Sequence, residues 1–225
     1  MSANPHPTPS CTAWHGVVSG PAGDLELRLE LPERPRHPAT LALICHPHPL
    51  HGGSMHNKVV HTLARAFVRL HFAALRFNFR GTEGSAGAYD DGVGELDDAL
   101  AALAWLRNRS SGEPIWLAGF SFGAAIAIRA AVESEPDGLI SVAPAITRFA
   151  ADLQKQPACP WLLLQGDQDE LVDIKATIAW VNRLSPGPEL AVMPGADHFF
   201  HGRLVELREL VTNFVQKKAG DDPGS

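Results

Sequence analysis

The sequence predicts an α/β fold, with a doubly wound, mostly parallel sheet and helices on both of its faces. Short, continuously apolar runs alternate along the chain with longer segments of helical periodicity. Apolar runs of this kind are typical of strands covered on both faces, and strands that alternate with helices imply right-handed crossovers between parallel strands. The 225 residues show no internal repeat and no linker that would divide them. We therefore expect a single domain over residues 13–217.

The first elements are predicted to form an antiparallel hairpin at an edge of the sheet. Trp14–Val18 and Leu25–Leu31 flank a turn at residues 20–23. In the second strand, leucines alternate with charged residues such as Glu30, as in a strand that exposes one face to solvent. The flanking residues 1–12 and 218–225 are polar and rich in Pro, Gly or charge, and we expect both to be disordered.

The remaining strands and helices alternate along the chain. Helices are expected where apolar residues recur at helical spacing, as leucines do over residues 94–107. The predicted strands cover residues 41–45, 72–77, 115–118, 139–143, 161–164 and 190–193, and the predicted helices cover residues 57–70, 94–107, 124–133, 174–184 and 203–215.

Residues 119–123 read G-F-S-F-G and lie between a predicted strand and a predicted helix. In this context G-x-S-x-G is the pattern of a nucleophile elbow, a tight turn that presents a serine hydroxyl. The glycines are needed because neighbouring backbone passes too close for a Cβ. The turn places Ser121 at a helix N-terminus, where free amides and the helix dipole favour an anion. Ser121 is the candidate nucleophile, and a glycine-rich turn with a surface serine is the alternative.

A serine hydroxyl becomes a good nucleophile when a base takes its proton and a third group orients that base. Two later loops supply such groups. Asp169 follows the strand predicted at residues 161–164, and His198 follows the strand predicted at 190–193. Loops at the carboxyl ends of parallel strands converge, and the order Ser, Asp, His is one in which such triads occur. We predict that Ser121, Asp169 and His198 are the catalytic residues.

Over most of its length, residues 14–215, the chain resembles the α/β-hydrolase superfamily. In detail it is similar to the small serine hydrolases without a cap domain that are related to dienelactone hydrolases and carboxylesterases. Residues 45–54, 119–123, 166–169 and 197–200 carry this resemblance. It implies that the acid of the family's G-x-x-D motif is Asp169, with Asp167 in the turn, and that the histidine is His198, with His201 at the start of the last helix.

The resemblance also bears on the substrate. Dienelactone hydrolases usually carry Cys as the nucleophile where this chain has Ser121, which favours a general esterase. Many lipases and epoxide hydrolases insert a cap before the strand that precedes the acid, whereas residues 144–160 are too few for a cap domain. An open or shallow pocket for small esters is therefore expected, with Phe120 and Leu50 as candidate pocket residues.

An acyl-transfer site also needs two amide donors that stabilise the oxyanion. One is expected to be the N–H of Phe122, the residue after the nucleophile. In similar families the second comes from the loop after the strand at residues 41–45, which here begins H-P-H-P at residues 46–49. Because proline has no N–H, we expect the amide of His48 to be the second donor, with the amide of Leu50 as the alternative.

Composition excludes several other classes of protein. The net charge of −6 and the pI near 6.0 give no basic surface for nucleic acid or an anionic membrane. No apolar run approaches the length of a membrane span, and the polar, proline-rich residues 1–10 contain no apolar stretch of signal-peptide length. Three scattered cysteines argue against a disulfide framework. We expect a cytoplasmic enzyme that acts on a small-molecule ester without a metal or cofactor, and the oligomeric state stays open.

Three alternatives remain. His46, His48 and His51 resemble the H-x-H-x-D-H motif of metallo-β-lactamase-like hydrolases, in which imidazoles hold zinc, but Leu50 stands where that motif needs Asp. A hydrolase fold that serves as a non-catalytic binding module would be expected to lack a triad residue or an elbow glycine. Thioesterase, lactonase or dienelactone hydrolase, and peptidase activities use the same acyl-enzyme chemistry, so the sequence does not separate them from esterase activity.

Overall fold

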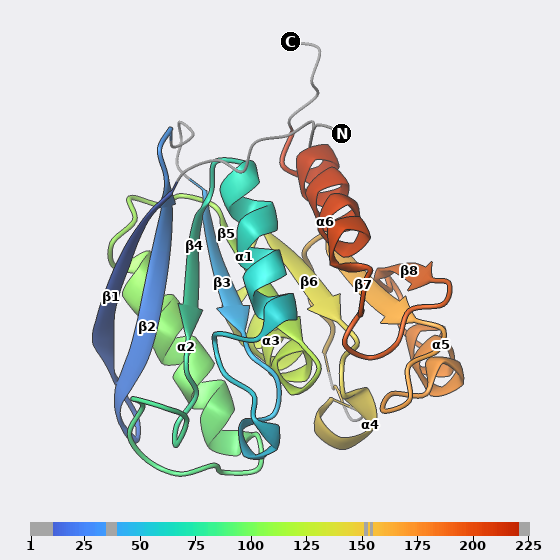
Figure 1. Ribbon diagram of the computed structural model, residues 1–225, viewed down its shortest axis with the longest axis horizontal. Helices are drawn as coiled ribbons and strands as arrows, with labels where there is room; N and C mark the ends of the chain where they lie inside the picture. Colours follow the sequence, from blue (N-terminus) through green and yellow to red (C-terminus); the bar gives the residue numbers. More distant parts are fainter. Residues whose placement is uncertain (1–10, 35–39, 151–152, 154, 221–225) are drawn as a thin grey trace.

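The computed structural model describes residues 11–34, 40–150, 153 and 155–220. An eight-stranded sheet runs through it in the order β1-β2-β4-β3-β5-β6-β7-β8 (Figure 1). The strands are β1 (Cys11–Gly20), β2 (Gly23–Pro32), β3 (Leu41–Cys45), β4 (Ala73–Phe77), β5 (Ile115–Phe120), β6 (Gly138–Val142), β7 (Trp161–Gly166) and β8 (Glu189–Met193). The helices are η1 (Pro49–His51), α1 (Lys58–Arg69), α2 (Val93–Arg107), α3 (Phe122–Ser134), α4 (Ile146–Phe149), α5 (Ile174–Val181) and α6 (Leu204–Lys218).

The sheet combines an antiparallel edge with a parallel body. β1 and β2 form an antiparallel hairpin, and β2 pairs antiparallel with β4. From β4 to β8 every neighbouring pair is parallel. The predicted α/β fold and the predicted edge hairpin are confirmed.

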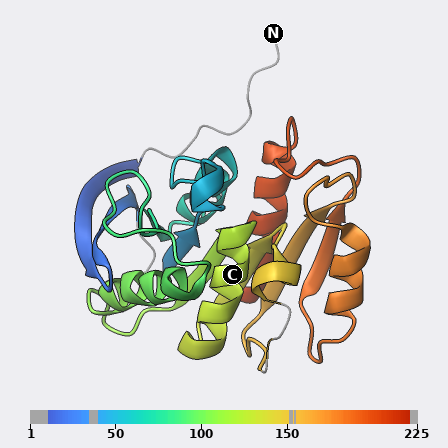
Figure 2. The ribbon, with the colours of Figure 1, turned by 90° about the horizontal axis from the view of Figure 1, so that it is seen from below.

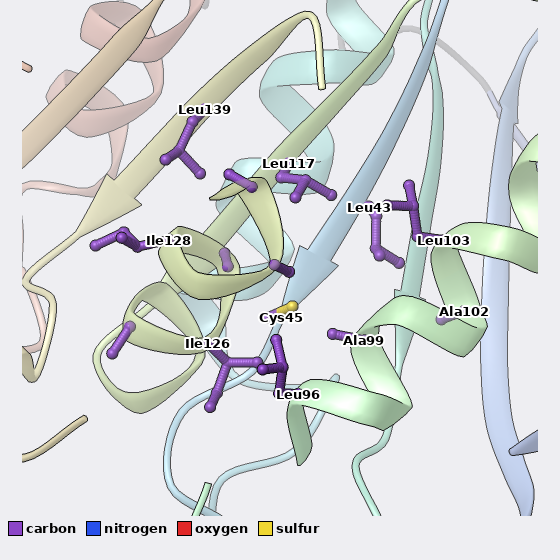
Figure 3. Packing of buried hydrophobic residues seen from close by; sticks show 14 of the residues in the cluster. Leu43, Cys45, Leu96, Ala99, Ala102, Leu103, Leu117, Ile126, Ile128 and Leu139 are labelled. Carbon is purple, nitrogen blue, oxygen red and sulfur yellow. The ribbon is translucent and has the colours of Figure 1, made fainter. Parts of the chain in front are cut away.

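Helices cover both faces of the sheet. Figure 2 shows α1 and α6 on one side of the strands and α2 and α3 on the other. Figure 3 shows the packing under α2 and α3, where Leu96 and Leu103 of α2 and Ile126 of α3 meet Leu43 and Leu117 of the sheet. The two faces thus bury separate hydrophobic clusters, as expected for strands that are apolar on both sides.

Helix α1 illustrates how the sequence forms these layers. Asn57 caps its first turn, because its side-chain oxygen accepts hydrogen bonds from the N–H groups of Val59 and Val60. Val60, Leu63 and Phe67 recur at helical spacing and are fully buried against the sheet. The helix therefore begins and packs as its sequence predicts.

The end of β2 departs from the predicted alternation. Glu30 is only 2% exposed, whereas Leu31 is 40% exposed. The Glu30 carboxylate forms an ion pair with Arg76 of β4, which is 1% exposed. Pairing between β2 and β4 ends at Glu30, so Leu31 extends past the neighbouring strand. The prediction that the charged face of this strand is solvent-exposed is wrong at Glu30.

The boundaries of the chain's elements also differ slightly from the prediction. β1 begins at Cys11 and α6 ends at Lys218, just outside the expected bounds of 13 and 217. Residues 1–10 and 221–225 of the two expected tails lie outside the described residues. Between β6 and β7 the described part of the chain contains one short helix, α4, and no cap domain. None of the helices in the described ranges combines the length and the hydropathy needed to cross a membrane.

Candidate active site

Ser121 lies in the tight turn between β5 and α3, at the carboxyl end of the parallel strands. Its backbone has φ 55° and ψ −117°, a conformation that non-glycine residues rarely adopt. Hydrogen bonds stabilise this turn: the Ser121 N–H donates to the Val142 carbonyl at 2.8 Å, and the Ser121 carbonyl accepts from Ala145 at 3.2 Å. A Cβ on Gly123 would lie 2.3 Å from the His46 carbonyl oxygen, so only glycine fits there.

The structure brings Asp169 and His198 to this serine. His198 Nδ1 lies 2.8 Å from Asp169 Oδ2, and His198 Nε2 lies 3.0 Å from Ser121 Oγ. Both the His198 and the Asp169 side chains are buried, at 2% and 0% exposed. An ionised carboxylate only accepts hydrogen bonds, so the proton of the neutral imidazole is on Nδ1 and Nε2 faces the serine hydroxyl as an acceptor.

The Asp169 carboxylate is held in the charged form. Burial alone would raise its pKa, but hydrogen bonds outweigh this and lower the pKa below its ordinary value. The donors are the His198 ring and the N–H groups of Leu171 and Val172, which lie 2.9 and 2.7 Å from Oδ1. The site therefore contains a fixed negative charge directly behind the imidazole.

The other acidic and histidine residues of these loops do not contact the serine. Asp167 Oδ1 accepts a hydrogen bond from the Gly195 N–H at 2.6 Å, and Glu170 accepts from the backbone N–H of His198 at 3.2 Å. His201 is exposed and pairs with Asp197 at 2.7 Å. The contacts of Asp167 and Glu170 join the loop after β7 to the loop after β8 and so help to hold His198 in place.

The loop after β3 packs against the first turn of α3. The backbone of His46 lies against Gly123. In addition, the ring centroids of His48 and Phe122 are 5.1 Å apart. The Leu50 N–H donates to His48 Nδ1 at 3.3 Å and is therefore engaged within the loop. Of the two candidate donors in this loop, the His48 amide is the one for which no internal partner is seen among the described residues.

His46 is fully buried at the base of this loop and uses both of its ring nitrogens. Nδ1 lies 2.6 Å from the Pro47 carbonyl, to which it donates, and Nε2 accepts from the Phe79 N–H at 2.9 Å. Burial lowers the pKa of His46 to about 4, so its ring is neutral. Across the described ranges no three His, Cys, Asp or Glu side chains are grouped closely enough to hold a metal ion.

The two candidate pocket residues differ in position. Phe120 is fully buried, with its ring 5.0 Å from that of His198. It packs against the His198 ring, and its side chain is not accessible to a ligand in this structure. Leu50, in contrast, is 69% exposed. Two further exposed apolar residues that the sequence did not single out lie beside the site residues: Leu171 is 65% exposed and Phe199 is 40% exposed.

Several polar contacts around the site were not predicted from the sequence. Gln165 donates to the Asp169 carboxylate at 2.7 Å. The Tyr89 hydroxyl oxygen lies 3.1 Å from His48 Nε2, and the hydroxyl donates a hydrogen bond to Asp91 Oδ1 at 3.0 Å. A signal for Gln165 was available, since it is a polar residue at the end of an otherwise apolar strand. Tyr89 carries no such signal, because its partner is 41 residues away in the sequence.

Known proteins are similar to this chain in both sequence and structure. The profile of a family described as serine aminopeptidase, S33, matches residues 48–150. An uncharacterized protein of Rickettsia prowazekii is 36% identical over 207 residues, which make up 88% of this chain and 86% of that protein.

Two solved structures are similar over nearly the whole chain. An alpha-beta serine hydrolase homologue from Coxiella burnetii is 49% identical, with 89% of this chain and 96% of that chain covered and a TM-score of 0.85. An α/β serine hydrolase without a lid from Xanthomonas campestris is 40% identical, with 94% of this chain and 97% of that chain covered and a TM-score of 0.85. The chain therefore belongs to the α/β-hydrolase superfamily, among its serine hydrolases without a lid.

Proposed function

We propose that this serine hydrolase is a carboxylesterase that cleaves small esters through an acyl-Ser121 intermediate. The observation that carries the proposal is the pair of hydrogen bonds that joins Asp169 to His198 at 2.8 Å and His198 to Ser121 at 3.0 Å. A base within hydrogen-bond reach of a serine hydroxyl, oriented in turn by a carboxylate, is the arrangement that activates serine for acyl transfer.

In the proposed reaction, Ser121 Oγ attacks the ester carbonyl while His198 Nε2 takes the hydroxyl proton. The imidazolium then donates this proton to the leaving alcohol, and the acyl group stays on Ser121. Asp169 keeps the imidazole in the tautomer with a proton on Nδ1 and stabilises its charged form. Water then attacks the acyl-enzyme carbonyl while His198 Nε2 takes its proton. The imidazolium returns this proton to Ser121 Oγ as the acyl–oxygen bond breaks, which releases the carboxylic acid and restores Ser121.

The carbonyl oxygen becomes negative in this reaction, and we propose that the N–H groups of Phe122 and His48 stabilise it. Phe122 is the first residue of α3, so its N–H has no partner within the helix. The packing of Gly123 on the loop after β3 supports the placement of His48 beside it. The dipole of α3 adds to the stabilisation, because its positive end faces the same oxygen.

The surroundings of Ser121 favour esters with an apolar group. Three exposed apolar residues follow site residues closely in the sequence: Leu50 is two residues after His48, and Leu171 is two residues after Asp169. Phe199 comes directly after His198, and the centroids of these two rings lie 5.1 Å apart. No cap covers them in the described part of the chain. Burial of a substrate's alkyl group against these side chains would lower the free energy of binding.

The experiment compares ester, thioester, lactone and amide substrates on wild type and Ser121→Ala. We expect p-nitrophenyl acetate to be hydrolysed with the highest kcat/KM, and Ser121→Ala to fold normally yet lose nearly all activity. A higher kcat/KM for an amino-acid p-nitroanilide would favour aminopeptidase activity, as the matched family's description suggests. Retained turnover in Ser121→Ala would contradict the acyl-serine mechanism.

A further inference from the structure

Gln165 occupies a strand position where an apolar side chain is expected. It lies near the end of β7, after one tryptophan and three leucines, and it is fully buried. Burial of an uncharged amide costs free energy unless hydrogen bonds satisfy it. The partners of this amide both belong to the loop that carries Asp169.

The nitrogen of the Gln165 amide makes two contacts. Nε2 donates to Asp169 Oδ2 at 2.7 Å and to the Val172 carbonyl at 3.4 Å. Because both neighbours are acceptors, the amide has to present its NH₂ group on this side. The amide oxygen Oε1 is consequently buried without a partner in the described structure. An unpaired buried acceptor is costly, and the need for a donor at Asp169 explains why the fold tolerates it.

We propose that Gln165 is a positioning residue that tunes the Asp169 carboxylate and thereby sets the pH range in which His198 acts as a base. The inference rests on the proposed function. Oδ2 accepts hydrogen bonds from both Gln165 and His198, so the two side chains share one oxygen atom. A second donor stabilises the negative charge on that atom and weakens its attraction for the imidazolium.

The carboxylate does not depend on Gln165 for its orientation. Its other oxygen, Oδ1, is fixed by the N–H groups of Leu171 and Val172. Without Gln165, the carboxylate therefore keeps facing His198, and the charge on Oδ2 attracts the protonated ring more strongly. More of the free enzyme is then protonated and inactive at a given pH, so the acid limb of the pH profile should move to higher pH.

The test measures kcat/KM for p-nitrophenyl acetate from about pH 5 to about pH 9 for wild type, Gln165→Met and Gln168→Met. Methionine has the length of glutamine but offers neither the donor nor the unpaired oxygen. Gln168 is an exposed residue of the same loop and provides the matched control. We expect the acid limb of the Gln165→Met profile to move to higher pH by about half a pH unit or more. The profile of Gln168→Met should coincide with that of wild type. A Gln165→Met profile that coincides with both would overturn the proposal.

A second variant keeps the proposal testable if Gln165→Met does not fold. Gln165→Glu preserves the shape and donates to Asp169 only while the new carboxyl is protonated, because two adjacent carboxylates share one proton. Once ionised, the new carboxylate offers no donor and adds negative charge beside Oδ2, so the acid limb of Gln165→Glu should also lie at higher pH than that of wild type. An acid limb that coincides with that of wild type would count against the role of Gln165. Ser121→Ala is measured in parallel: activity in that variant would refute the proposed function itself, whereas an inactive Ser121→Ala with an unshifted Gln165→Met would refute the tuning alone.

Discussion

Asp167 Oδ1 accepts a hydrogen bond from the Gly195 N–H at 2.6 Å, and this contact separates the roles of two carboxylates in one loop. Asp167 joins the loop after β7 to the turn that precedes His198. Asp169, two residues later, contacts the His198 ring itself at 2.8 Å. The first contact holds two loops together, and the second orients the proposed base.

Replacement of each of these two aspartates by asparagine should therefore have different effects on activity. Asp169→Asn removes the charge behind the imidazole and allows the wrong tautomer, so we expect kcat to fall by roughly 10⁴-fold. Asp167→Asn keeps an acceptor for Gly195 and should change kcat by less than about tenfold. Steady-state kinetics with p-nitrophenyl acetate measures both, and a larger loss in Asp167→Asn would move the acid to that residue.

The proposed oxyanion donor in the loop after β3 can be removed as a single N–H group. His48 has φ −53°, within the range of a proline ring, so His48→Pro should preserve the backbone while eliminating the donor. We expect kcat to fall by roughly 100- to 1,000-fold. His48→Ala removes the ring but keeps the N–H, and it provides the control. Equal kcat values for the two variants would show that the amide of His48 is not a donor.

The exposed apolar side chains beside the site should determine the preference for alkyl length. In the double variant Leu50→Ser with Leu171→Ser, kcat/KM for a long-chain p-nitrophenyl ester should fall about three- to tenfold relative to the acetate ester, because less apolar area is buried. Val17→Ser changes a residue that is 56% exposed on β1, at the far edge of the sheet, and should leave the ratio unchanged. An unaltered ratio in the double variant would exclude these side chains from substrate binding.

Buried His46 should make the fold sensitive to acid. Its pKa is lowered by burial to about 4, whereas in the unfolded chain it titrates at about 6.5. Between these two pH values the unfolded state binds more protons than the folded state. The contribution of His46 to the free energy of unfolding is therefore complete above about pH 6.5, and it falls by about 3 kcal/mol as the pH drops toward about 4.

Denaturant unfolding of wild type and His46→Gln at about pH 7 and about pH 4 measures this contribution. Glutamine retains an acceptor for the Phe79 N–H but does not titrate. The loss of stability on acidification should be smaller in the variant. The same loss in both proteins would show that His46 does not carry the acid sensitivity.

The sequence was sufficient to predict most of the fold, for a physical reason. Strands such as β3 and β7 are buried on both faces and read as continuous apolar runs. The short helices η1 and α4 were not predicted, because three or four residues do not complete enough turns to show a period. Glu30 was placed in solvent because its partner Arg76 is 46 residues away and no local pattern reveals the pair.

The candidate site, like the fold, could be predicted from the sequence only in part. Ser121, Asp169 and His198 stand in short motifs after predicted strands, and the topology that brings such loops together could be anticipated. Contacts between side chains from different loops could not be anticipated from the sequence. The burial of Phe120 under His198 and the link from Tyr89 to His48 both depend on packing between distant segments.

The proposed mechanism requires above all that Ser121 is an activated nucleophile. Intact-protein mass spectrometry after incubation with a fluorophosphonate tests it most directly, because the reagent forms a covalent bond with an activated serine and does so without knowledge of the substrate. We expect a single adduct on wild type and none on Ser121→Ala. An unmodified wild type, or an adduct that persists on Ser121→Ala, would contradict the role of Ser121 as the nucleophile.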